Sequence, residues 1–421
     1  MPMTHALCVA LFVVLGVGLA ADRSSAADPR APETDLPVRV KPMLIGQVGA
    51  EHFGNAVYRR STEGPRIAAS GTRILEWAVQ QSAPAAEVVP NRPGRYSNGA
   101  CAMDVNGDGI DEMILARQED PSQGSDVLWF EEVPGRQHWK EHLVGQLTEW
   151  EAPHDVMPIE TTAAGRGVRG VAVVSARRLL YWFQIPGDPT QPWGKHEIAD
   201  LQQGGMVGAE SGLVLGDLAG NGRPDLVCGN FWAECPTDPT SQPWKVRRYC
   251  DWDGHPIPGK DAGWGGMAQL DLGDMDGDGR LEIVAAEAEI PEARLGVFSR
   301  DPADPDGLWR STLIDSGLYC PHSLVVADVT GDGRPDILVG EMTAGGWKVP
   351  RKPDPKLYLY LNGGDLTFRR YVLHSGWGVH MMRMAPRPPG HTGAFVFAAD
   401  EIQSWYPDMI TGVVGWTIGP K

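Results

Sequence analysis

Short apolar runs separated by turn residues recur along the chain and predict β-strands. In one unit, SLVVAD (323–328) leads into a glycine-rich loop, and DILVGEM (336–342) follows it. The aromatic run LYLYLNG (357–363) comes next, and FRRYVLH (368–374) ends the unit. Runs of this length, rich in β-branched and aromatic residues, are typical of strands. Because no long window shows helical periodicity, the pattern predicts four strands per unit.

The unit repeats along the chain at a spacing of about 55 residues. Clear copies of its loop begin at Asp104, Asp217, Asp274 and Asp328. Degenerate copies fall in the same register: they begin at Tyr58, at Glu160, which ends HDVMPIE (154–160), and at Pro386. Seven units of four strands predict an all-β, seven-bladed β-propeller of four-stranded blades.

The chain ends predict how this propeller closes. VRVKPMLIGQ (38–47) resembles a fourth strand, yet it precedes the first unit. We expect it to pair into the last blade, beside TGVVGWTIG (411–419), because this pairing removes an open sheet edge.

The repeated loops have the composition of calcium sites. Oxygen ligands at loop positions 1, 3, 5 and 9 suit Ca²⁺, and glycine at position 6 permits the turn. A helix–loop–helix site needs glutamate at position 12, where this chain has Ala285 and Val339, so the acid at position 9 must close the loop. The alternative is a polar turn without metal. The predicted ligands are Asp274, Asp276, Asp278 and Glu282; Asp104, Asn106, Asp108 and Glu112; Asp328, Thr330, Asp332 and Asp336; and Asp217, Asn221 and Asp225. The last loop has Ala219 at position 3, so its occupancy is the least expected.

The loop pattern D-x-[DN]-x-[DN]-G-x-x-[DE] before a strand resembles the FG-GAP/VCBS repeats of extracellular propellers, which include the integrin-α head. HFGNAV (52–57) is a trace of the FG motif, and the resemblance covers roughly residues 38–410. It implies a propeller in which roughly two to four structural Ca²⁺ ions hold blade hairpins.

A second repeated position lies six residues before each loop. From the first unit to the last it reads His52, Asn98, His154, Ser211, Ala268, His322 and His380. Four of the chain's 11 histidines share this position, which opens each innermost strand. We therefore expect these side chains to gather around one end of the central channel.

Aromatic and acidic residues accompany this histidine column and predict a sugar ligand. Aromatic faces stack on the apolar sides of a sugar ring, while polar groups take its hydroxyls. The expected ligand-binding residues are Trp150, Glu210, Trp264, Tyr319 and Trp377. The alternative for the tryptophans is packing between blades.

The four histidines are the candidate catalytic residues. Imidazole serves as a general base and as a metal ligand, so His52, His154, His322 and His380 could also hold a second divalent metal. The alternative is that each histidine only bonds a neighbouring blade.

A closer resemblance supports the catalytic interpretation. APHDVMPIE (152–160), CPHSLVVADVTGDGRPDILVGEM (320–342) and GVHMMRMAP (378–386) are similar to the propeller domain of the aldos-2-ulose dehydratase family. That family eliminates water from keto-sugars with metal assistance, which implies that the four histidines lie at the reacting end. The chain lacks the cupin domains of that family, so no isomerase step is expected.

Composition excludes some partners. The net charge is −17, which disfavours nucleic acid, because nucleic-acid binding depends on Lys and Arg neutralising phosphates.

Cysteines 101, 228, 235, 250 and 320 form no CxxC pair, so a cysteine zinc site is not expected. A disulfide between Cys235 and Cys250 stays open.

The first residues predict export. ALCVALFVVLGVGLA (6–20) is a short apolar run followed by small residues, which indicates a signal peptide over 1–27; a membrane anchor is the alternative. We expect a linker over 28–37 and a propeller over 38–421. No other segment is long and apolar enough to span a bilayer, so a secreted or periplasmic monomer is predicted.

Two functions follow from these patterns. The first is a calcium-stabilised propeller that binds or acts on carbohydrate, as a metal-assisted keto-sugar dehydratase or lyase. The second is a non-catalytic FG-GAP module that binds a glycan or a protein. Convergence on one axial site, rather than pockets repeated between blades, favours the first.

Overall fold

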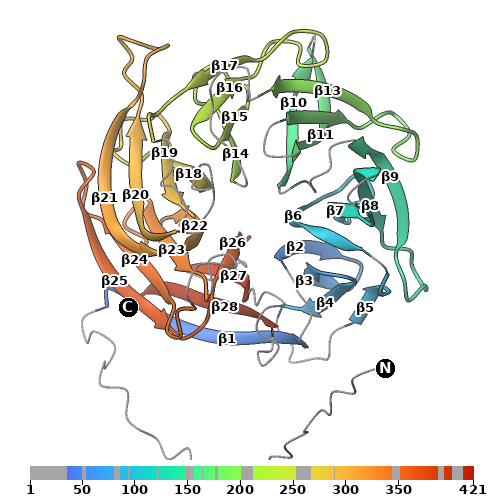
Figure 1. The fold of residues 1–421 in the computed structure, drawn as a ribbon, viewed down its shortest axis with the longest axis horizontal. Coiled ribbons are helices and arrows are strands. Elements are labelled where there is room, and N and C mark those ends of the chain that lie inside the picture. The colour runs from blue at the N-terminus through green and yellow to red at the C-terminus, as the bar shows by residue number, and fades with distance from the viewer. Residues whose placement is uncertain are drawn as a thin grey trace, which may run out of the picture.

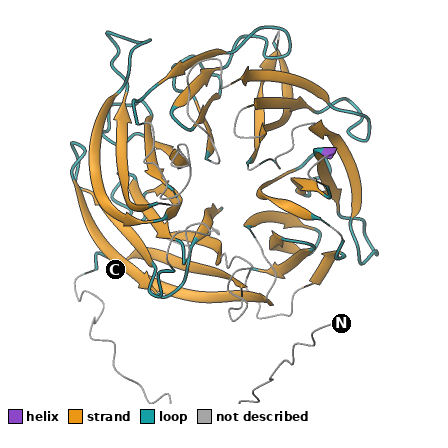
Figure 2. Cartoon of the chain, viewed as in Figure 1, coloured by secondary structure: helices purple, strands orange, loops and turns teal. Residues whose placement is uncertain are grey.

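The computed structural model has seven four-stranded antiparallel sheets arranged around one axis (Figures 1 and 2). It describes residues 36–49, 54–79, 86–92, 94–120, 123–147, 153, 155–163, 165–175, 179–200, 212–252, 267–288, 290–343, 351–386, 393–400 and 411–421. The predicted signal peptide and most of the predicted linker lie outside these residues. The predicted seven-bladed propeller is confirmed.

Blades 1 to 6 each use four consecutive strands, with the first strand innermost. Blade 1 contains β2 (Asn55–Ser61), β3 (Gly64–Ser70), β4 (Ile74–Ala78) and β5 (Ala86–Val89). Blade 2 contains β6 (Arg95–Met103), β7 (Glu112–Gln118), β8 (Ser125–Glu131) and β9 (Lys140–Leu147). Blade 3 contains β10 (Val156–Ala163), β11 (Arg166–Ser175), β12 (Leu179–Gln184) and β13 (Gly194–Asp200). Blade 4 contains β14 (Leu213–Gly216), β15 (Asp225–Cys228), β16 (Phe231–Glu234) and β17 (Lys245–Arg248). Blade 5 contains β18 (Met267–Gly273), β19 (Glu282–Glu287), β20 (Pro291–Ser299) and β21 (Arg310–Tyr319). Blade 6 contains β22 (Pro321–Ala327), β23 (Asp336–Glu341), β24 (Lys356–Asn362) and β25 (Phe368–Ser375).

Blade 7 joins the two ends of the described chain. It contains β26 (His380–Ala385), β27 (Ala394–Asp400), β28 (Thr411–Pro420) and, outermost, β1 (Val38–Gly49). The ladder runs antiparallel from the pair Val38–Pro420 to the pair Gly49–Thr411. The expected closure by the N-terminal strand is therefore confirmed.

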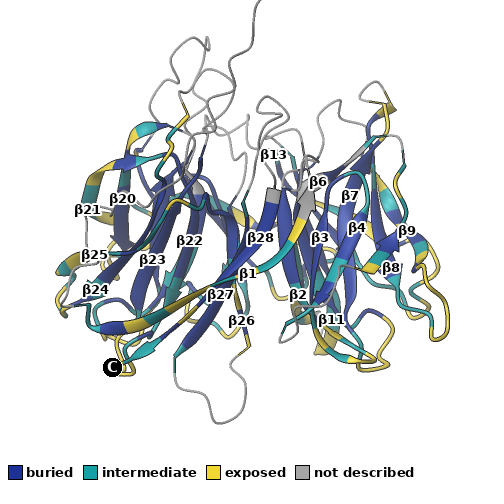
Figure 3. Ribbon diagram, turned by 90° about the horizontal axis from the view of Figure 1, so that it is seen from below, coloured by how far each residue is buried: buried dark blue, intermediate teal, exposed yellow. Residues whose placement is uncertain are grey.

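The core lies between the blades, where the faces of neighbouring sheets meet (Figure 3). Strands β7 and β23 are buried at every position, because neighbouring sheets cover both of their faces. Aromatic residues of the third strands fill this space; Trp129, Trp182, Trp232 and Trp416 expose at most 1% of their surface. These aromatics therefore form the core between the blades.

Backbone hydrogen bonds repeat between neighbouring blades. The N–H groups of three tryptophans that precede fourth strands donate to the fourth-strand region of the preceding blade. The pairs are Trp139 with Val88, Trp193 with Val144, and Trp309 with Tyr249, at 2.7–3.2 Å. A tryptophan before the fourth strand therefore marks these three blade junctions.

The cysteines take part in the core as thiols. Cys101, Cys228, Cys235, Cys250 and Cys320 are all buried as thiols. A disulfide between Cys235 and Cys250 is not formed: the Cys235 sulfur lies 3.8 Å from the Thr161 hydroxyl instead.

Among the described residues, no helix has the length and apolar content that a membrane crossing requires.

A carboxylate also joins two innermost strands. Asp271 of β18 accepts hydrogen bonds from its neighbour Leu272 N–H (2.8 Å) and from Val326 N–H of β22 (2.7 Å). Burial raises the pKa of Asp271 to about 6, and the two N–H donors only partly offset this effect. A half-buried carboxylate therefore bridges blades 5 and 6.

Removal of β1 tests the closure of the ring. We expect a chain that begins at residue 50 to melt more than about 10 °C below the full chain, because blade 7 loses its outer ladder. Circular dichroism gives the melting temperature. A chain that begins at residue 36 is the control and should melt like the parent; equal melting of all three chains would contradict the role of β1.

The half-buried carboxylate predicts a pH dependence of stability. Because the folded pKa of Asp271 lies above the ordinary value, its contribution is present below about pH 4 and is lost as pH rises through about 6. We expect the stability of the parent relative to Asp271→Asn to increase by about 1 kcal/mol per unit as pH falls from 6 to 5. Urea unfolding measures this difference, and exposed Asp251→Asn should show no such trend.

Candidate functional site at the axial channel

The innermost strands are bulged where the histidine column begins. The register shifts lie between Tyr96 and Ala100, Met267 and Gln269, Pro321 and Ser323, and His380 and Arg383. These intervals contain or border the column positions of blades 2, 5, 6 and 7. Bulges redirect side chains and are over-represented near active sites. The repeated column therefore coincides with a repeated backbone irregularity.

Two column histidines meet at this end of the channel. The rings of His322 and His380 stack with their centroids 4.4 Å apart and their planes at 21°. Gln269 of blade 5 joins them, with its Nε2 3.3 Å from His322 Nδ1 and 3.4 Å from the Met381 sulfur. Blades 5, 6 and 7 thus contribute to one cluster, as the expected convergence requires.

The histidine pair is more buried than a funnel lining would be. His322 and His380 each expose 1% of their surface. Side chains of an innermost strand point alternately toward the two neighbouring blades, so they pack between blades instead of facing the open axis. The expectation of an open, histidine-lined funnel is therefore wrong for these two residues.

Hydrogen bonds place the ring protons of the two histidines differently. His380 Nδ1 lies 2.6 Å from the Gly54 carbonyl oxygen, so Nδ1 carries a proton and donates it. The amide nitrogen of Gln269 donates to His322 Nδ1, so the proton of His322 is on Nε2. In its neutral form His380 would therefore be unprotonated at Nε2, where His322 carries its proton.

Several predicted site residues cannot be compared with this cluster. His52, His154, Trp150, Glu210 and Trp264 lie outside the described residues.

The two described aromatics of the set, Tyr319 and Trp377, lie in packed surroundings. Tyr319 packs on Cys320 and Met342, and the Lys352 ammonium lies 5.3 Å from its ring centroid. The Trp377 ring lies 4.5 Å from His374 and 5.9 Å from Trp416, between blades 6 and 7. These contacts correspond to the packing alternative for Trp377.

Sequence reasoning missed Gln269 and Arg383. Gln269 follows the column position Ala268 by one residue, and the bulge between Met267 and Gln269 alters which side chain reaches His322. Arg383 lies beyond a second bulge, and its Nη2 donates to the Ala100 carbonyl of β6 at 2.9 Å. No alternation rule applied to the sequence could find either residue, because a bulge shifts the alternation.

The acidic loops lie at the other end of the innermost strands. His322 opens β22 and Asp328 follows its last residue, so the two positions are about 20 Å apart along the strand. Loop glycines 107, 109, 277, 279, 331 and 333 have φ between 78° and 88°, a region that favours glycine. Each innermost strand therefore has the histidine column position at one end and the loop at the other.

The loop at 274–282 has the donor set that best fits Ca²⁺. Oxygens of Asp274, Asp276 and Glu282 all lie within 4.8 Å of one another. Asp274 accepts the N–H groups of Gly277 and Gly279, and Glu282 Oε2 accepts the N–H of Met275, which fixes the carboxylates in place. An all-oxygen set of this kind matches the preference of calcium. The residues therefore fit the predicted ion.

The acid at loop position 9 distinguishes the loops. Glu282 and Glu112 each accept a loop N–H through one oxygen, which leaves the second oxygen directed at the loop; Glu112 Oε1 lies 3.4 Å from Asn106 Nδ2. Asp225 and Asp336 are shorter, and both oxygens of each accept backbone N–H groups. The two glutamate loops therefore keep more ligand capacity than the two aspartate loops.

Burial raises the pKa of these four acids. The pKa of Glu112 and Glu282 rises to about 7, and that of Asp225 and Asp336 to about 6, first because of desolvation. Neighbouring carboxylates add to the shift, while backbone N–H donors oppose it. A bound dication would relieve this crowding of negative charge.

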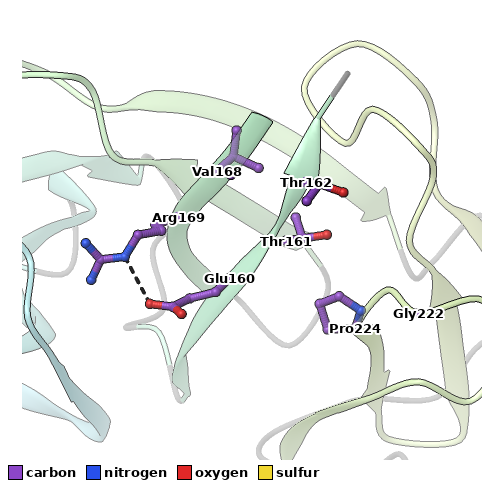
Figure 4. Close-up of a pocket in the computed structure, with 8 residues that line it drawn as sticks. Glu160, Thr161, Thr162, Val168, Arg169, Gly222 and Pro224 are labelled. Atoms are coloured by element: carbon purple, nitrogen blue, oxygen red, sulfur yellow. Dashed lines mark hydrogen bonds and ion pairs between the residues drawn. The ribbon is translucent and has the colours of Figure 1, made fainter. Parts of the chain in front are cut away.

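A polar cleft of ≈ 470 Å³ lies at the loop end, between blades 3 and 4 (Figure 4). Glu160, Thr161 and Thr162 of β10 line one side, and Gly222 and Pro224 of the 217–225 loop line the other. Arg169 Nε pairs with Glu160 Oε1 at 2.9 Å. The cleft is therefore separate from the histidine cluster.

These features define the class of protein: a seven-bladed β-propeller with acidic turn loops at one end of the axis and a histidine cluster at the other. The sequence profile of the FG-GAP repeat matches residues 321–351, which contain β22, the 328–336 loop and β23. The chain therefore carries an FG-GAP repeat in blade 6, and the resemblance to this family is confirmed there.

Solved structures share the fold at low sequence identity. Sqt1 from Chaetomium thermophilum is 9% identical with a TM-score of 0.51, over 90% of this chain and 100% of Sqt1. The PQQ-bound aldose sugar dehydrogenase from Streptomyces coelicolor is 10% identical with a TM-score of 0.42, over 92% and 100%. The Penicillium chrysogenum α-L-arabinanase complexed with arabinobiose is 9% identical with a TM-score of 0.43, over 89% and 97%. The likeness to Sqt1 shows the fold alone, and the two weaker ones carry no argument. No curated protein sequence matches the chain.

Calcium dependence tests the loops. We expect millimolar Ca²⁺ to raise the melting temperature over a chelator-treated sample, and Asp276→Ala to lose part of the gain, because a bound ion stabilises only the folded chain. Ala219→Asp should enlarge the gain by completing position 3 of the 217–225 loop.

The matched control is exposed Asp301→Ala, which lies outside these loops. It should respond to Ca²⁺ as the parent does. Equal melting temperatures of the parent in calcium and in chelator would contradict the calcium sites.

Proposed function

We propose that the chain is an exported, calcium-stabilised propeller that acts on a keto-sugar at the histidine end of its channel, by eliminating water. The observation that carries the proposal is the pairing of two imidazoles with opposite tautomers. Export and calcium binding rest on the sequence patterns and on the oxygen ligands of the 274–282 loop.

The hydrogen bonds of His322 and His380 support acid–base chemistry in which one ring accepts a proton and the other donates one. His380 Nε2 would take the proton from the carbon next to the ketone, and the C–H electrons would form the C=C bond. The C–O bond to the neighbouring hydroxyl would break, and that oxygen would take the proton of His322 Nε2 and leave as water. One proton is gained and one is lost, and the product is an enone.

The second metal that we expected at the histidines stays a prediction, because His52 and His154 lie outside the described residues. A catalytic metal site needs about three protein ligands, so His322 and His380 would need at least one further ligand. Among the described residues, the group of three metal-binding side chains is the one in the 274–282 loop. The steps above use only His380 and His322, and a bound metal would add polarisation of the ketone oxygen.

The second candidate is a non-catalytic module that binds a glycan or a protein. The observation that favours it is burial, since each ring exposes only 1% of its surface and has bonds that hold it between blades. In that case the stacked pair only ties blades 5, 6, 7 and 1 together.

Enone formation tests the proposal. We expect the purified chain to convert a 2-keto or 3-keto glycoside to a product with enone absorbance, and His380→Gln to lower the rate at least about 100-fold, because the proton acceptor is lost. His322→Gln should slow the reaction by a similar factor. Absorbance against time is the measurement.

Exposed His138→Gln is the matched control and should keep the parental rate. Glycan binding without turnover of any keto-glycoside would support the binding module instead. Full activity of both His322→Gln and His380→Gln would overturn the assignment of the site.

A further inference from the structure

Arg383 shares a face of β26 with His380 because of the bulge between them. His380 pairs with Ala399 and Arg383 pairs with Phe397, so three steps on β26 match two on β27. Met381, inside the bulge, has φ of 53°, which a residue with a side chain rarely adopts. The extra residue gives His380 and Arg383 the relation of i and i+2, about 7 Å apart on one side of the sheet.

The Arg383 side chain reaches across the channel. Its Nη2 donates to the carbonyl oxygen of Ala100 on β6, in blade 2. The innermost strand of blade 1, β2, stands between β26 and β6 around the ring (Figure 1). Half-buried Arg383 therefore spans from blade 7 to blade 2 at the axis, beside the histidine cluster.

The guanidinium has donors that the described residues leave unused. Its Nε is buried and has no hydrogen-bond partner among them. No carboxylate of the described residues lies within ion-pair distance of Arg383, although buried Arg59 pairs with Glu76 and Glu132 in the same protein. The thiol of nearby Cys101 offers no anion, since burial raises its pKa to about 12. A buried donor without an acceptor is costly. Arg300 also has a buried Nε without a partner but lies away from the axis, so it is the position of Arg383 beside the histidine cluster that points to a ligand.

We propose that the histidine end of the axis selects sugars that carry a carboxylate, and that Arg383 binds this group at a position about 7 Å along β26 from His380. The planar guanidinium matches a carboxylate with two parallel hydrogen bonds, which no neutral hydroxyl provides. The spacing of about 7 Å between the two positions suits one sugar ring with its carboxylate substituent. This inference deepens the proposed function and rests on it, because it needs a sugar in the channel.

Binding of matched acids and esters tests the inference. The probes are D-glucuronic acid and D-galacturonic acid, their methyl esters and the neutral hexoses, titrated by calorimetry. We expect the parent to bind at least one acid about tenfold or more tightly than its ester, and Arg383→Gln to bind both equally weakly. Arg383→Lys should recover part of the preference, because it keeps the charge but not the planar pair of donors.

Arg300→Gln is the matched control: Arg300 is half-buried and bonds the Leu218 and Pro305 carbonyls, and it should keep the parental preference. Melting temperatures confirm that each variant folds. Equal binding of acid and ester by the parent, or an unchanged preference in Arg383→Gln, would overturn the role of Arg383 while leaving sugar binding intact. No binding of any sugar would instead contradict the proposed function itself.

Discussion

The ladder between β1 and β28 is the interaction on which the structure depends. It joins residues from the two ends of the described chain, from Val38–Pro420 to Gly49–Thr411. Blades 1 to 6 are built from consecutive strands, so each can form locally, but blade 7 needs a strand from far away in sequence. Because each sheet buries its faces against two neighbours, an unclosed ring would leave apolar faces of the first and last blades exposed.

The two ends of the axis follow from the same strand geometry. Each innermost strand begins at the histidine end and runs into an acidic loop, so one repeat unit supplies both features about 20 Å apart. The loop end depends on local contacts: Asp274 and Glu282 bond N–H groups of their own loop. The histidine end depends on contacts between blades, since Gln269, His322 and His380 come from three sheets. A change in blade packing would therefore alter the histidine cluster more than the loops.

The sequence predicts the repeated features well and the irregular ones poorly. Strand number, blade number, the closing strand and the core tryptophans follow from period and composition, since every unit must bury the same faces. The difference between glutamate and aspartate at loop position 9 does not follow, because only the structure shows that both oxygens of Asp336 accept N–H groups while Glu282 accepts one through Oε2. The burial of His322 and His380, the part played by Gln269 and the reach of Arg383 do not follow. They depend on register shifts inside strands, which alternation of polar and apolar residues does not encode.

The hydrogen bond from His380 Nδ1 to the Gly54 carbonyl links the first residue of β26 to the entry of blade 1. These two residues are 326 positions apart, so this contact exists only after the circle is complete. In a partly assembled wheel, the Gly54 carbonyl would not yet hold the proton of His380 Nδ1. The proton acceptor that the proposed function requires would therefore be set only in the final step of assembly.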